Sequence, residues 1–185
     1  MKKKILFSLI ICLIFFAGNA QTASVEKSTY GIQTGLLGIW IHNEMRLTNQ
    51  IALRTELGMN AGIFGGDFYP QTGFLMTPVI TVEPRWYYNL ENRQSKSKNI
   101  SGNSGNFVSL QTSYHPNWFV ISNYDNLKTF NLLTIIPTWG IKRNVGEHFT
   151  YETAIGIGYG HQFREAYGDL EGVTANLHLR IGYRF

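Results

Sequence analysis

The fold is decided by the stretch Val173-Thr-Ala-Asn-Leu-His-Leu-Arg-Ile-Gly-Tyr-Arg-Phe185. Apolar residues alternate along it with polar residues or glycine, and this period of two is typical of a β-strand with one apolar face. The apolar positions are Val173, Ala175, Leu177, Leu179, Ile181, Tyr183 and Phe185. The positions between them are Thr174, Asn176, His178, Arg180, Gly182 and Arg184. The basic face of this strand points either to water, as in a soluble sandwich, or into the interior of a closed membrane barrel.

The same alternation recurs upstream and predicts further strands. Clear alternating or extended runs cover residues 30–44, 51–60, 77–88, 107–115, 129–142, 151–163 and 173–185. Single-chain bacterial barrels have an even number of strands, so we expect about eight, with the missing one in 22–44 or in 116–124. Pro78 and Pro84 indicate bulges or a local break, because proline cannot donate to a ladder. The polar stretch 89–106 is predicted to be a mobile linker, and no helix of useful length is expected.

Residues 1–20 are expected to be a signal peptide, and residues 21–185 a single folded domain. Three lysines at positions 2–4 precede an apolar run over 5–16, and Gly18-Asn19-Ala20 supplies the small residues of a cleavage site near Ala20/Gln21. An apolar run of that length falls well short of the ~20 residues that a spanning helix needs.

Without this leader the charge and cysteine content change. The formal net charge of +4 loses three lysines and becomes +1, so a nucleic-acid partner is not indicated. The single cysteine, Cys12, lies in the leader, so disulfides and thiol chemistry are not expected in residues 21–185.

The composition after residue 20 favours a membrane protein built from strands. Aromatic residues and glycine are frequent, and no later apolar run reaches the length of a spanning helix. Lipid provides no hydrogen-bond partner for an open sheet edge, so such strands must close on themselves. We therefore predict an all-β fold, a transmembrane antiparallel up-and-down β-barrel of about eight strands with a filled polar lumen.

The chain resembles the small outer-membrane β-barrel proteins of Gram-negative bacteria. The resemblance rests on the leader, the glycine-rich alternating strands and the terminal Tyr183-Arg-Phe185. The segments Val82-Glu-Pro-Arg-Trp-Tyr-Tyr88 and Gly102-Asn-Ser-Gly-Asn-Phe107 are similar to those of an uncharacterised subgroup described as an outer-membrane protein β-barrel domain. The resemblance implies location in the outer membrane, contact with lipid and lipopolysaccharide, and recognition of the strand ending in Phe185 by the barrel-assembly machinery. It also implies that the linker after Tyr88 is a periplasmic turn, while the loops around 63–75, 116–128 and 164–172 face outward.

The alternation predicts an interior set of charged side chains. The inward positions are Arg54, Glu56, Glu83, Arg85, Lys142, Glu152, His178, Arg180 and Arg184. Unpaired charges would be costly in a filled lumen, so an ion-pair network is favoured over a selective pore or an internal active site. We expect His178, Arg180 and Arg184 to meet the carboxylates Glu56, Glu83 and Glu152.

Catalytic, metal and cofactor sites are not predicted. Ser113 and His115 share a strand face, and His161 and Glu165 lie near another strand end, but nucleophilic catalysis also needs an orienting carboxylate within reach. The five histidines are scattered, with only His42 and Glu44 at ligand spacing, and Gly156-Ile-Gly158-Tyr-Gly160 has no following helix to complete a phosphate loop.

The leading functional hypothesis is a non-enzymatic outer-membrane barrel with a structural, adhesive or ligand-contacting role. A lipid A-modifying hydrolase or acyltransferase and a narrow pore are the alternatives within the membrane. A soluble periplasmic lipocalin-like barrel is the alternative outside it, and there Leu177, Leu179 and Ile181 would face inward.

Overall fold

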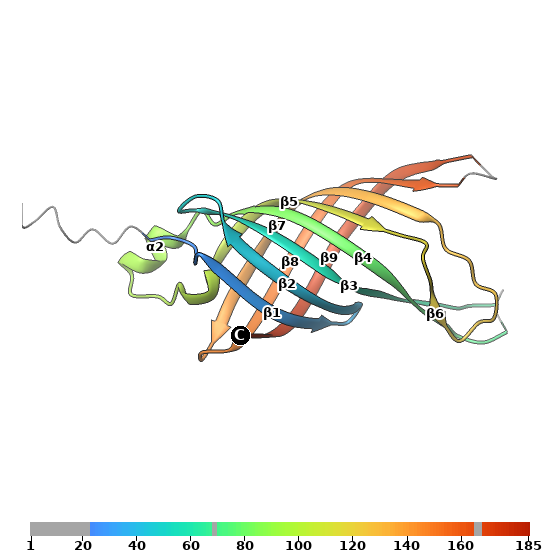
Figure 1. Ribbon diagram of the computed structural model, residues 1–185, viewed down its shortest axis with the longest axis horizontal. Helices are drawn as coiled ribbons and strands as arrows, with labels where there is room; N and C mark the ends of the chain where they lie inside the picture. The colour runs from blue at the N-terminus through green and yellow to red at the C-terminus, as the bar shows by residue number, and fades with distance from the viewer. Residues whose placement is uncertain (1–22, 68–69, 165–167) are drawn as a thin grey trace, which may run out of the picture.

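The structure is a computed structural model and describes residues 23–67, 70–164 and 168–185. The expected signal peptide over 1–20 lies outside the described residues. Nine strands account for most of the described chain (Figure 1). Their bounds are β1 Ser28–Gly35, β2 Gly38–Arg46, β3 Ile51–Phe64, β4 Gly73–Trp86, β5 Gly105–His115, β6 Ile121–Ser122, β7 Asn131–Val145, β8 Phe149–Phe163 and β9 Leu170–Arg184.

The strands form one antiparallel sheet that closes in a ring. Its order is β3-β2-β1-β9-β8-β7-β5-β4, and a ladder between β3 and β4 completes the circle. The first strand meets the last one, with Gly31 opposite Arg184 and Gly35 opposite Arg180. The remaining two-residue strand, β6, pairs with β4 beyond the end of β5.

The prediction of about eight strands therefore describes the ring, and β6 adds a ninth. The missing strand is in the first of the two expected places, because the run over 30–44 is a hairpin of β1 and β2 joined by Leu36 and Leu37. The short β6 occupies the second place. The sequence did not separate β1 from β2 because the Leu36-Leu37 pair at their junction contains none of the residues that usually mark a turn.

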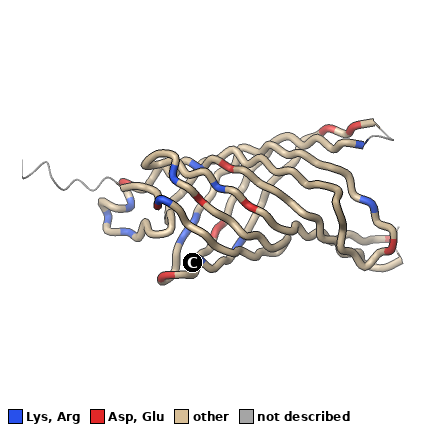
Figure 2. The backbone as a smooth tube through the Cα atoms, in the orientation of Figure 1, with Lys and Arg blue, Asp and Glu red and all other residues tan. Residues whose placement is uncertain are grey.

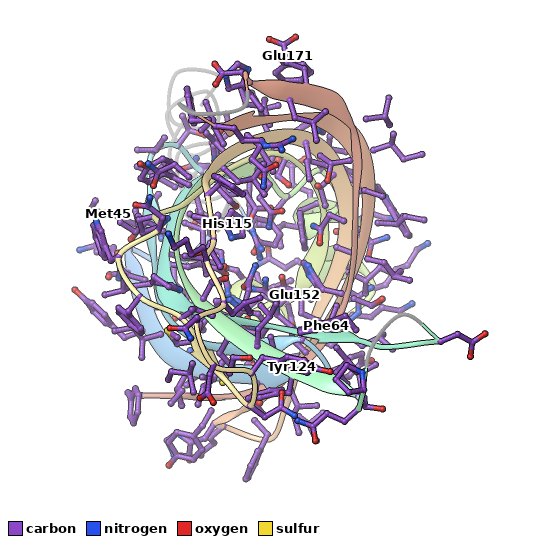
Figure 3. All side chains as sticks on the ribbon, turned by 90° about the vertical axis from the view of Figure 1, so that its right-hand side faces the viewer. Met45, Phe64, His115, Tyr124, Glu152 and Glu171 are labelled. Carbon is purple, nitrogen blue, oxygen red and sulfur yellow. The ribbon has the colours of Figure 1, made fainter. Side chains whose placement is uncertain are left out.

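The two faces of the strands separate by polarity as the alternation predicts. In β4, Thr81, Glu83 and Arg85 are buried inside the ring, whereas Val82 and Trp86 are exposed on its outside. Figure 3 looks into the ring from the β6 end and shows Glu152 within it and Met45 on the outside. Polar and charged side chains thus fill the interior, and large apolar side chains cover the outer surface.

The ring has two different ends, which we name the loop end and the turn end. The loop end carries the β3–β4, β5–β7 and β8–β9 connections, and the turn end carries the β2–β3 and β7–β8 turns with the β4–β5 connection (Figure 1). The strand ends that lead into the three expected outer loops therefore lie at the same end of the ring, opposite the predicted turn after Tyr88.

The β4–β5 connection differs from the expected linker. It contains the helix α2 (Leu90–Ser95) and the 3-10 helix η1 (Ser101–Asn103). Leu90, Gly102 and Asn103 are buried, so this polar stretch is packed against the turn end. The composition of the β4–β5 connection is that of a linker, and it is ordered because these few residues pack against the turn end.

Pro84 interrupts a ladder without adding a residue, whereas Pro78 lies opposite Met59 in an unbroken β3–β4 ladder. The β4–β5 pairing runs from Ile80 to Val82 and resumes at Arg85, which leaves a break at Pro84. The interruption spans equal numbers of residues on both strands, whereas a bulge adds a residue to one of them. Of the two structures expected at Pro84, the local break is therefore the one that forms.

Candidate functional site: a charge network beneath a polar cavity

The centre of the interior is Glu44 of β2, a carboxylate with no exposed surface. Its Oε1 accepts hydrogen bonds from Lys142 Nζ at 2.9 Å, Arg54 Nη1 at 3.0 Å and Arg85 Nη1 at 3.3 Å. Its Oε2 accepts one from Asn103 Nδ2 at 2.6 Å. One carboxylate thus joins strands β2, β3, β4 and β7 to the β4–β5 connection.

The remaining carboxylates are also paired. Arg85 binds Glu152 of β8 in a bidentate manner at 2.8 and 2.9 Å, and its Nη2 also donates to Glu83 at 2.8 Å. Glu56 accepts from Arg54 and, at 2.8 Å, from Nη1 of Arg180 of β9.

The network reaches all eight long strands. Gln33 of β1 accepts from Arg54 Nη2 at 2.6 Å, and Ser109 of β5 donates to Glu83 at 2.6 Å. Among the described residues, the buried charged side chains are four cations and four carboxylates: Arg54, Arg85, Lys142, Arg180, Glu44, Glu56, Glu83 and Glu152. This balance offsets the desolvation that burying any one of them would cost alone.

The predicted interior set is confirmed for most members, with one wrong pairing. His178 lies 3.1 Å from Glu152, and Arg180 binds Glu56. Arg184 instead pairs at 3.0 Å with Glu26, which belongs to the segment before β1. The strand tilt carries position 184 to the turn end, out of reach of the interior carboxylates.

Glu44 was missed as an interior residue. It ends the run over 30–44, where the undetected turn hid the periodicity of β2. The sequence still carried a signal, because Trp40, His42 and Glu44 alternate with Ile39 and Ile41. Treating residues 38–46 as a separate strand would have put Glu44 on the polar face.

The turn end of the interior is closed by a small apolar core. Its buried members are Ala23, Val25, Ala52, Tyr87, Leu90, Phe107 and Ala154. The Arg85 guanidinium lies 4.2 Å above the Phe107 ring, which joins this core to the network. Burial, and next the Glu44 carboxylate, hold the pKa of Tyr87 well above its usual range. Its hydroxyl therefore stays protonated and donates to Glu44 Oε2 at 3.1 Å.

The segment before β1 seals this end further. The backbone N–H of Glu26 donates to Asn103 Oδ1 at 2.7 Å, and the Glu26 carboxylate accepts from the N–H of Gly102 and from Arg184. Figure 2 shows charged residues gathered over this half of the ring, while the strands toward β6 carry few before the loop tips.

The other half of the interior holds a cavity of about 470 Å³, the loop-end cavity. Its lining includes polar side chains from five strands: Asn60, Thr81, Gln111, Ser113, His115, Thr134, Thr174, Asn176, His178 and Arg180. Apolar walls come from Leu37, Trp40, Ala61, Val79, Leu132, Ile136, Ala175 and Leu177. The Trp40 ring lies 4.0 Å from the Arg180 guanidinium, and its Nε1 donates to Asn60 Oδ1 at 2.8 Å.

The predicted serine and histidine candidates are only partly brought together. Ser113 and His115 both line the loop-end cavity, and Ser113 Oγ lies 2.8 Å from Thr81 Oγ1. The described lining contains no carboxylate that could orient His115. His161 instead lies between Asp169 and Glu171, at 3.1 and 3.0 Å, near the loop end. Glu165 lies outside the described residues.

Comparisons of the chain with protein-family models, curated proteins and solved structures found no match. Within the described residues, no cluster of three or more His, Cys, Asp or Glu side chains could hold a metal ion. No helix in the described part of the chain combines the length and hydropathy needed to cross a membrane.

Chemically, the interior divides into two parts. The network near the turn end has its charges satisfied by one another and is closed by the apolar core. The loop-end cavity has polar side chains that can donate and accept hydrogen bonds, beside apolar walls. Binding of a small polar or amphipathic group is the chemistry that this arrangement supports.

Proposed function

We propose that residues 21–185 form an integral outer-membrane β-barrel protein that acts without catalysis, through ligand contact at its loop end. The observation that carries this proposal is the inversion of polarity between the inside and the outside of the ring. Soluble domains bury apolar side chains and rarely expose large apolar patches, whereas membrane barrels do the reverse.

The outer surface supports a bilayer-spanning position. Exposed aliphatic residues such as Ile41, Leu57 and Ile155 lie along the middle of their strands. Aromatic side chains gather toward the turn end, where Tyr183 contacts Phe149 and Phe185 at ring distances of 5.7 and 5.4 Å. Such a girdle is typical of the membrane–water interface. The turn end would then face the periplasm and the loop end the outside of the cell.

The absence of catalysis is supported by the loop-end cavity. Ser113 is hydrogen-bonded to Thr81, and the described lining supplies no carboxylate to orient His115, the histidine on its own strand face. The histidine that does contact a carboxylate, His178, bonds Glu152, which is itself held by Arg85 within the charge network. Mass spectrometry of lipid A from cells with and without the protein tests this part of the proposal. We expect identical acylation, and a lost or added acyl chain would show that the protein modifies lipid A.

The membrane location is tested by fractionation and gel migration. We expect the protein to remain with membranes through salt and alkaline washes and to require detergent for release. Unboiled protein should migrate differently from boiled protein, because a closed ring of strands resists unfolding by detergent. Release by salt alone, or identical migration, would refute the membrane location. The C-terminal strand can be tested in the same assay with Phe185→Ala, which should reduce assembly if the assembly machinery recognises this residue.

A further inference from the structure

The wall of the ring is incomplete above the β1–β2 hairpin. β1 pairs with β9 only from Arg180 to Arg184, so Leu170–Leu179 of β9 have no ladder partner on that side among the described residues. On the other flank, β2 pairs with β3 only as far as Asn60. Figure 1 shows the β1–β2 hairpin ending well short of the β6 end, while β3 and β9 continue.

The loop-end cavity extends through this gap. Inside the ring it is lined by inward-facing residues such as Asn60 and Asn176. Its lining also includes Ala61 of β3 and Ala175 of β9, which lie on the outward-facing positions of the two flanking strands. Leu37 at the hairpin tip completes the lower edge. The cavity therefore opens sideways through the wall as well as toward the loop end.

The hairpin tip lies at the depth of the hydrocarbon in the proposed orientation. The tip residues Leu36 and Leu37 are 84% and 52% exposed, whereas tight turns in water favour Gly, Asn and Asp. Leu36 lies six positions after Tyr30, whose carbonyl accepts a hydrogen bond from the Phe185 N–H in the aromatic girdle. Six residues of a tilted strand rise about 15 Å, against an apolar band about 25 Å tall. The opening then faces lipid.

The unpaired edge of β9 indicates what fills the opening. Backbone N–H and C=O groups facing hydrocarbon are costly unless a polar partner satisfies them. Arg180, Asn176 and Ser113 supply further donors within the cavity. Arg180 donates its Nη1 to Glu56, whereas its buried Nε has no hydrogen-bond partner among the described residues.

We propose that this opening admits a single-chain amphiphile from the bilayer, with its oxygen-bearing head in the loop-end cavity and its acyl chain over Leu37. The proposal rests on the membrane location proposed above. The shared chemistry is a carboxylate or hydroxyl head on one hydrocarbon chain. Arg180, stacked on Trp40, is the anchor for the head, and Ala61 and Ala175 keep the passage open because their side chains are small.

Trp40 provides a direct readout, because it is 5% exposed and faces the cavity. One variant keeps only Trp40, with Trp86, Trp118 and Trp139 changed to Phe. A second keeps only Trp139, which is exposed on the outer surface. Each is refolded into vesicles and titrated with dodecanoate brominated close to its head, with the correspondingly brominated alcohol, or with a two-chain brominated phospholipid.

We expect saturable quenching of Trp40 by a brominated single-chain amphiphile and little quenching by the phospholipid. Ala61→Phe with Ala175→Phe should abolish the saturable phase. The matched control, Thr55→Phe with Leu179→Phe, places the same rings on the same strands below the opening. It should leave the saturable quenching of Trp40 unchanged. Arg180→Gln should weaken binding of the carboxylate about tenfold and that of the alcohol less, because only the carboxylate carries a charge.

Three results would overturn the proposal. They are an unquenched Trp40, quenching that the Phe pair leaves unchanged, and disulfide-linked dimers of an Ala175→Cys variant, which would show that a second copy covers the β9 edge. The Trp139 variant separates this failure from failure of the membrane location. If the phospholipid quenches Trp139 but no amphiphile quenches Trp40, only the proposed amphiphile site is refuted. If Trp139 is not quenched, the membrane location itself is refuted.

Discussion

At the residue scale, the interior depends on Glu44 more than on any of the carboxylates that the sequence singled out. It is the one carboxylate that Lys142, Arg54 and Arg85 all contact. Each of these cations is fully or almost fully buried, so none can turn to water if its partner is lost. A single neutral substitution at this position therefore affects three strands at once.

We predict that Glu44→Gln destabilises the folded protein by about 3–5 kcal/mol, because it leaves buried cations in excess of carboxylates. The measurement is urea unfolding in vesicles. Glu147→Gln is the control, since its carboxylate is 92% exposed, and it should change stability by less than about 0.5 kcal/mol.

The double variant Glu44→Gln, Lys142→Met gives a sharper test of charge balance. It removes one carboxylate and one cation together, so we expect it to be more stable than Glu44→Gln alone. Equal or greater loss of stability in the double variant would mean that Glu44 acts through its hydrogen bonds and not through the balance of charge.

A glycine in β3 makes a second prediction at this scale. A Cβ at Gly58 would lie 2.3 Å from the Ile39 carbonyl oxygen and 2.4 Å from Trp40 Cδ1. We predict that Gly58→Ala costs about 1–3 kcal/mol in the same unfolding measurement, because the hairpin and the Trp40 ring must both move. Gly172→Ala in β9 is the control, since nothing lies within 4 Å of its Cβ. Equal effects at the two sites would contradict the tight packing of Trp40.

At the scale of elements, the short β1–β2 hairpin is the feature that distinguishes this ring from a uniform cylinder. β3, β4, β7, β8 and β9 have 14 or 15 residues each, whereas β1 has 8 and β2 has 9. The gap between β3 and β9 follows from that difference in length. The cavity and its sideways opening are thus consequences of one short hairpin.

Strand β9 gives the prediction that separates a membrane barrel from a soluble one. Leu179 is exposed on the outside of the ring, near the middle of the proposed apolar band. Leu179→Arg should cost about 2–4 kcal/mol in vesicles, because the charge is placed in hydrocarbon. Leu170→Arg, on the same strand near the loop end, should cost about 0–1 kcal/mol. A soluble protein would tolerate both substitutions equally.

At the scale of the whole molecule, the two halves of the interior have different roles. The turn end is filled by the charge network, by the buried core around Tyr87 and Phe107, and by the segment that carries Glu26. The loop end is hollow and open. The interior of the ring is therefore closed at the turn end and open at the loop end.

A ring whose interior is closed at one end should not conduct ions across a membrane. We predict that the protein gives no stepwise conductance in a planar bilayer, since the paired charged side chains and the apolar core fill the turn end of the interior. A wide channel protein inserted into the same bilayer is the positive control. Discrete conductance steps from the purified protein would show that the network opens and would favour the narrow-pore alternative.

The sequence by itself determined the strands, their two faces and the polar interior. A period of two places every second side chain on one side of the sheet, so Arg54, Arg85 and Glu152 could be placed inside without knowing their partners. The inward position of most predicted charged residues followed from this local rule. The break at Pro84 was also predictable, because it depends only on the missing N–H of proline.

Only the tertiary structure decided which residues meet. The pairing of Arg184 with Glu26, the central place of Glu44 and the ordering of residues 89–106 depend on register and strand tilt, which bring together positions up to 158 residues apart. Alternation carries no information on relative strand length either. The sequence therefore indicated a filled lumen, whereas the short β1–β2 hairpin leaves the loop-end cavity and its opening, because the closure of a ring depends on the partners of every strand at once.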